Sequence, residues 1–161
     1  MSDPLATYLA DHLSDAQIAI ELLEAMRDQH DDPRFREFAS ALLPEIQADD
    51  ETLHSIAEKI GSCPSAIKQA GGWLLEKATR LKLGHTGSTD FAMFESLELL
   101  AVGIQGKLCL WKALQAAART DSRLGDYNLD QLINRAKQQY DKVENQRIDL
   151  AGTVLSPPNK S

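Results

Sequence analysis

Apolar residues recur at helical spacing along most of the chain, and short polar stretches interrupt them. The first apolar stripe follows the pair Asp3-Pro4, and the second follows Asp32-Pro33. Each pair combines an aspartate, which caps the amide groups of a first helical turn, with a proline, which is favoured at the first helical position. The pattern therefore predicts two helices, over about residues 4–29 and 33–60.

The second half of the chain carries two further long stripes and one shorter one. Residues 91–118 are the most apolar stretch, which predicts a helix that is buried on more than one side. Asn128, with Gln131 three residues later, resembles a capping box and introduces a helix that continues to about Gly152. Between the two halves, residues 65–83 are amphipathic and predict an additional, shorter helix.

The lengths of the connections predict how the helices are joined. The first two long helices are separated by a tight turn and the last two by a short loop, so each pair is expected to be antiparallel. About thirty residues separate the second long helix from the third. A helix over residues 65–83 would span about 28 Å at 1.5 Å per residue, enough to return along the bundle. We therefore expect an all-α, up-down four-helix bundle with a long crossover that contains an additional helix, as one domain over residues 1–155 with a flexible tail at 156–161.

Composition excludes several classes of function. The chain has 17 basic and 24 acidic side chains and a formal charge of -7, which argues against nucleic acid as a partner. No stretch approaches the ~20 apolar residues of a membrane span, and the first residues do not have the pattern of a signal peptide. We therefore predict a cytoplasmic protein. The two cysteines, Cys63 and Cys109, lack metal-ligand spacing and are expected to be reduced.

A Glu-x-x-His step supplies the candidate chemistry. Glu51 and His54 are three residues apart in a predicted helix, so both side chains could hold one metal ion. Glu144 stands in the same relation to Arg147 in the last predicted helix. The first copy therefore suggests a metal centre, whereas the second has an arginine where a ligand should be. The alternative is that these residues bind no metal and lie on solvent-exposed helix faces.

With this topology and this motif, the chain resembles the ferritin-like superfamily. The stretches 73–77, 80–83 and 103–111 are also similar to bacterial ferritin-like proteins of unknown or stress-associated function. In that family, a glutamate from each of the first and third long helices joins a Glu-x-x-His from each of the other two to hold two iron or manganese ions. Carried over to this chain, the resemblance implies Glu51, His54 and Glu144 as metal ligands, with Asp15, His12, Gln105 and Glu98 as weaker candidates.

The same comparison predicts that the metal site is degraded. Helix 91–118 offers Gln105, rather than a glutamate, at the position opposite Glu144, and an amide brings no negative charge. Arg147 carries a permanent charge and a fork of donors, so it is expected to pair with Glu144 or Glu51 and to take the place of a cation. We therefore expect no cofactor, or iron or manganese if the site binds one.

These observations lead to one functional hypothesis and two alternatives. The hypothesis is a ferritin-like, homodimeric, non-catalytic protein with a binding or stress-associated role. One alternative is a di-iron or di-manganese carboxylate protein that acts on oxygen or peroxide, and the other is a purely structural interaction module. The sequence has no phosphate-binding loop, Cys-x-x-Cys pair or Gly-x-Ser-x-Gly elbow, so it does not support other catalytic classes.

Overall fold

The computed structural model describes residues 3–62 and 89–157, and every regular element within these ranges is helical. The helices are α1 (Pro4–Gln29), α2 (Pro33–Ile60), α4 (Thr89–Ala117) and α5 (Leu129–Val154), with a 3-10 turn at Ser122–Leu124 between the last two. The prediction of four long helices is confirmed, and their ends differ from the predicted ends by about two residues or fewer. The predicted helix at 65–83 lies outside the described residues.

The predicted start signals form the expected caps. The side chain of Asp3 accepts a hydrogen bond from the amide of Leu5 at 3.0 Å, and that of Asp32 accepts one from the amide of Arg34 at 2.9 Å. The guanidinium of Arg34 also binds the Asp32 carboxylate and, with the amide, lowers the pKa of Asp32 to about 2. Local sequence therefore fixes where α1 and α2 begin.

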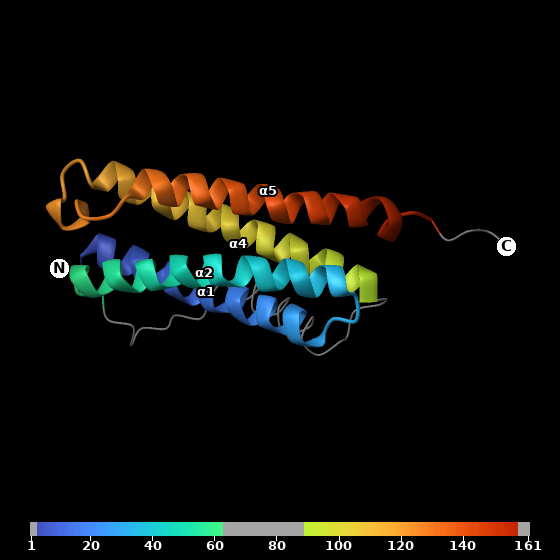
Figure 1. Ribbon diagram of the computed structural model, residues 1–161. Coiled ribbons are helices and arrows are strands. Elements are labelled where there is room, and N and C mark those ends of the chain that lie inside the picture. Colours follow the sequence, from blue (N-terminus) through green and yellow to red (C-terminus); the bar gives the residue numbers. More distant parts are fainter. Residues whose placement is uncertain (1–2, 63–88, 158–161) are drawn as a thin grey trace.

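The four helices pack side by side, with α1 and α5 running in one direction and α2 and α4 in the other (Figure 1). α1 is antiparallel to α2, and α4 is antiparallel to α5. α1 also lies against α4, and an ion pair between Glu45 and Lys142 joins α2 to α5. α2 and α4 run in the same direction, so the end of α2 and the start of α4 lie at opposite ends of the bundle.

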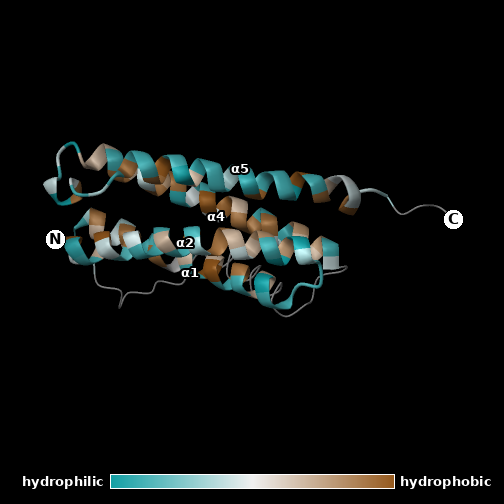
Figure 2. Cartoon of the chain, in the orientation of Figure 1, coloured by the Kyte–Doolittle hydropathy of each residue, from teal (hydrophilic) through white to brown (hydrophobic). Residues whose placement is uncertain are grey.

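Hydrophobic residues are densest on α4, whereas much of α5 is hydrophilic (Figure 2). The interior contains two hydrophobic clusters. Ile46, Ile104 and Val143 belong to the first cluster, and Leu53 and Leu108 belong to the second. Polar residues separate the two clusters near the middle of the bundle. None of the described helices combines the length and apolarity needed to cross a membrane.

Candidate functional site: a polar layer inside the bundle

Asp49 is the centre of a buried polar layer formed by α2, α4 and α5. Its side chain is 2% exposed. One carboxylate oxygen, Oδ2, accepts hydrogen bonds from Lys107 Nζ at 2.5 Å and from Gln139 Nε2 at 3.0 Å. The other oxygen, Oδ1, accepts from Arg135 Nε at 2.7 Å and from Arg135 Nη2. We call Asp49, Lys107, Arg135 and Gln139 the polar layer.

Helix periodicity places three of these residues at interior positions. Asp49 lies three residues after Ile46 and four before Leu53, and both neighbours are buried. Lys107 has the same spacing between the buried Ile104 and Trp111, and Gln139 has it between the buried Ala136 and Val143. Residues separated by three and four positions share one helix face, so each polar side chain points into the core.

The polar layer pairs one carboxylate with two cationic side chains. Lys107 is 15% exposed and Arg135 is 29% exposed, so both remain largely shielded from water. Burial lowers the pKa of Lys107, and the nearby charge of Asp49 opposes this effect. Gln139 has no exposed surface and bonds to both Asp49 and Lys107. The charged groups of the layer therefore satisfy one another instead of facing solvent.

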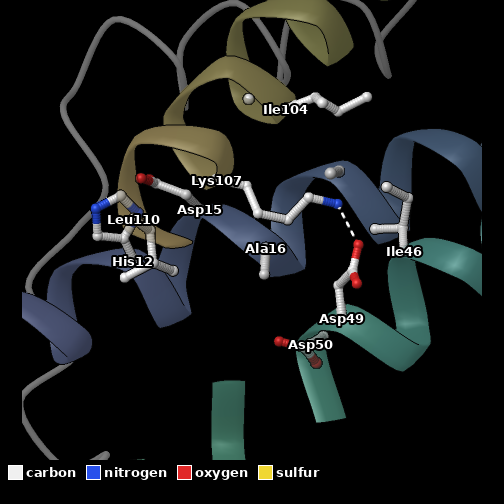
Figure 3. A pocket seen from close by; sticks show the side chains of 11 residues that line it. His12, Asp15, Ala16, Ile46, Asp49, Asp50, Ile104, Lys107 and Leu110 are labelled. Carbon is white, nitrogen blue, oxygen red and sulfur yellow. Dashed lines mark hydrogen bonds and ion pairs between the residues drawn. The ribbon is translucent and has the colours of Figure 1, made fainter. Parts of the chain in front are cut away.

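A cavity of about 40 Å³ adjoins the polar layer on the side of α1 (Figure 3). His12 and Asp15 of α1 line it together with Asp49, Asp50 and Lys107. Burial raises the pKa values of Asp15 and Asp50 and lowers that of His12. A space of this size accepts a few water molecules at most and leaves no room for an organic substrate.

Replacing Asp15 with asparagine is expected to raise the melting temperature at pH 7. Because burial raises the pKa of Asp15, the folded chain binds the carboxyl proton of Asp15 more tightly than the unfolded chain does. The contribution of Asp15 to stability therefore falls as pH rises from 3.8 through the raised pKa. The gain from Asp15→Asn should shrink as pH falls toward 3.8, as measured by calorimetry across this range. Glu58→Gln, at an exposed site on α2, is the control, and a gain independent of pH would contradict the prediction.

The structure places the predicted ligands Glu51 and His54 on the surface of α2. Both residues are exposed, and the side chain of His54 keeps 50% of its accessible surface. Nδ1 of His54 contacts the backbone oxygen of Asp50 at 2.9 Å, one turn earlier in the same helix. The Glu-x-x-His step therefore lies on a solvated face, beside the polar layer in sequence but not part of it.

Arg147 pairs with Glu144 of its own helix and is not one of the partners of Asp49. Its Nε and Nη2 donate to the two oxygens of Glu144 at 2.8 and 2.7 Å, which lowers the pKa of that carboxyl. Its Nη1 lies 3.4 Å from Glu98 Oε2 on α4. Gln105 is exposed to solvent. Of the weaker candidates, Asp15 and His12 line the cavity beside Lys107, whereas Glu98 and Gln105 do not.

The described residues do not fit the di-metal centre that the ferritin-like resemblance implies. Among residues 3–62 and 89–157, no three His, Cys, Asp or Glu side chains are arranged so that they could hold a metal ion. At the centre of the bundle, both oxygens of Asp49 already accept hydrogen bonds from cationic groups. The partners of Asp49 are therefore a lysine and an arginine.

Sequence reasoning missed all four residues of the polar layer. The signal that could have found three of them is a polar residue within an otherwise apolar stripe. Asp49 interrupts the stripe of α2, Lys107 interrupts the most apolar helix, and Gln139 interrupts the stripe of α5.

Comparison with known proteins adds no assignment, because no protein-family model, curated protein or solved structure matches the chain. The functional proposal therefore rests on the polar layer.

Proposed function

We propose that the chain is a ferritin-like bundle in which its own cationic side chains take the place of metal ions, and that it acts as a non-catalytic binding or stress-associated protein. The parallel course of α2 and α4 supports the ferritin-like topology, since it requires a long crossover. A cytoplasmic location and a homodimeric state stay predictions from the sequence. One further observation supports the proposal that cationic side chains take the place of metal ions.

That observation is the position of the Lys107 side chain. Nζ crosses the interior from α4 to reach Asp49 on α2, and Gln139 of α5 receives a hydrogen bond from the same nitrogen at 2.5 Å. Three helices therefore converge on one lysine nitrogen at mid-length of the bundle. An ammonium group satisfies these acceptors without any bound ion. The cavity that adjoins the polar layer is water-sized, so an organic substrate does not fit beside Lys107.

Metal content measured by inductively coupled plasma mass spectrometry tests the proposal. The untagged protein would be purified without chelator and then challenged anaerobically with Fe²⁺, Mn²⁺ or Zn²⁺. We expect no stoichiometric metal and no change in melting temperature, because the acceptors of the polar layer are already occupied. Glu51→Ala, at the exposed predicted ligand, should behave as wild type does. Stoichiometric iron or manganese that is lost in Glu51→Ala would overturn the proposal and favour the carboxylate oxidase.

A further inference from the structure

Lys107, Gln139 and Asp49 place an amine, a carboxamide and a carboxylate in mutual contact. Lys107 Nζ lies 2.5 Å from the carboxamide oxygen of Gln139 and 2.5 Å from Asp49 Oδ2. The carboxamide nitrogen of Gln139 lies 3.0 Å from the same Oδ2. Figure 3 shows the lysine side chain extending across the interior toward Asp49. The three groups have the functionality that an amide-exchange reaction requires.

We propose that Lys107 and Gln139 form an intramolecular isopeptide cross-link between α4 and α5. The new bond joins Lys107 Nζ to Gln139 Cδ, and the bond between Cδ and Nε2 breaks. A neutral amine and a primary carboxamide become a secondary amide and one molecule of ammonia, with no oxidation or reduction. The cross-link does not depend on the ferritin-like assignment, since it follows from the contacts of these three side chains. In the cross-linked chain the amide replaces the Lys107 ammonium group, and Arg135 remains the cation that binds Asp49.

Proximity favours attack on the carboxamide carbon. A carbon–oxygen double bond is about 1.2 Å long, so Cδ of Gln139 lies within about 3.7 Å of Lys107 Nζ. Reacting atoms held close to about 3–3.5 Å react as if at very high concentration, provided that thermal motion aligns them. Both residues lie on packed helices, and Gln139 has no exposed surface. The bundle therefore holds the amine beside one carboxamide and excludes bulk water.

Asp49 Oδ2 provides a path for the proton. This oxygen contacts both the nucleophilic nitrogen of Lys107 and the departing nitrogen of Gln139. It can accept a proton as Nζ attacks and return it to Nε2 as ammonia leaves, which is general base and then general acid catalysis. Arg135 binds the other oxygen and fixes the orientation of the carboxylate. Burial, which lowers the pKa of Lys107, favours the neutral amine.

Charge balance and space also favour the product. Before reaction, Asp49 faces two cationic side chains; afterwards the lysine nitrogen is a neutral amide, the proton of the former ammonium group leaves on the released ammonia as an ammonium ion, and Arg135 alone balances the carboxylate. The new amide N–H can still donate to Asp49. The adjoining cavity of about 40 Å³, lined by Lys107 and Asp49, accepts a molecule the size of ammonia. Escape of ammonia into dilute solution makes the step effectively irreversible.

Intact mass spectrometry of the denatured protein tests the cross-link directly. We expect the wild-type chain to be lighter than its sequence mass by about 17 Da, the mass of the released ammonia. Proteolysis should then yield a branched peptide in which the segments that contain Lys107 and Gln139 are joined. A full-length chain at the sequence mass, with both segments recovered as separate peptides, would overturn the proposal. This outcome would leave the proposed metal-independent bundle intact.

Two variants assign the mass change to these residues. Lys107→Arg keeps a cation but removes the nucleophilic amine, and it should restore the sequence mass. Lys142→Arg, at an ion pair on the surface, should retain the loss of ammonia. A loss that persists in Lys107→Arg would come from another reaction, such as cyclisation at an asparagine, and would contradict the cross-link. Because the wild-type chain is itself measured, the test does not depend on how well either variant folds.

Discussion

Replacing Asp49 with alanine is expected to lower the free energy of unfolding by about 3–5 kcal/mol. The substitution removes the carboxylate that binds Lys107, Arg135 and Gln139, all of which would remain inside the bundle. A buried cation without its partner loses both hydration and Coulomb attraction, so the folded state bears the full desolvation penalty. Urea denaturation followed by circular dichroism measures the change.

A double-mutant cycle separates this effect from ordinary side-chain loss. In the Lys107→Met background, Asp49→Ala should be less destabilising than in wild type, because one of the two cations that lose their partner is already absent. Asp126→Ala breaks an exposed ion pair with Lys59 and should leave the denaturation midpoint close to that of wild type. Equal losses for Asp49→Ala and Asp126→Ala would show that the polar layer carries no special share of the stability.

Trp111→Ala is expected to lower the free energy of unfolding by about 3–5 kcal/mol. The indole has no exposed surface and packs within the hydrophobic cluster that includes Leu53, Leu108 and Ala136. Truncation to a methyl group would remove apolar contacts on several helices and leave a cavity that the bundle can fill only in part. The change can be measured by urea denaturation with circular dichroism as the signal.

The matched variant Trp111→Phe isolates the indole nitrogen. Trp111 Nε1 is buried and has no hydrogen-bond partner among residues 3–62 and 89–157. Phenylalanine keeps most of the aromatic contact and removes this unsatisfied donor, so its loss of stability should be much smaller than that of alanine. If phenylalanine were as destabilising as alanine, the indole N–H would have to donate a hydrogen bond to a group outside the described residues.

The helices could be predicted from sequence because their signals are local. The capping aspartates Asp3 and Asp32 act within one or two residues, and so does Gly61, whose φ of 78° suits a glycine at the end of α2. The pairing of antiparallel neighbours follows from short connections, which also appear directly in the sequence. These features need no knowledge of the rest of the molecule, and the structure confirms them.

The polar layer could not be predicted in the same way because it depends on which face of each helix points inward. Successive residues of an α-helix are rotated by about 100°, so a residue two positions away from an interior residue lies on nearly the opposite side. Glu51 stands two positions after Asp49, and Gln105 stands two before Lys107, and both are exposed. The Glu-x-x-His spacing is present in the sequence, but spacing within one helix does not reveal which face of that helix points into the core.

The sequence predicts that a cationic side chain pairs with a carboxylate inside the bundle. In the structure, Lys107 pairs with Asp49 in this way. The sequence pointed to Arg147, which instead pairs with Glu144 of its own helix and lies near Glu98. The sequence does not single out Lys107, because a lysine in an apolar helix usually extends its charge to solvent. Its partner Asp49 is 58 residues away in sequence, so no local pattern connects them.

These long separations have a consequence for the order in which the molecule assembles. The pairs α1–α2 and α4–α5 are hairpins of neighbouring helices, which need only short loops to close. Asp49 meets Arg135 and Gln139 across 86 and 90 residues of chain, so these contacts arise when one hairpin docks on the other. The carboxylate that would promote the cross-link therefore reaches its reactants after docking. The covalent bond would then be present only in chains that have completed folding.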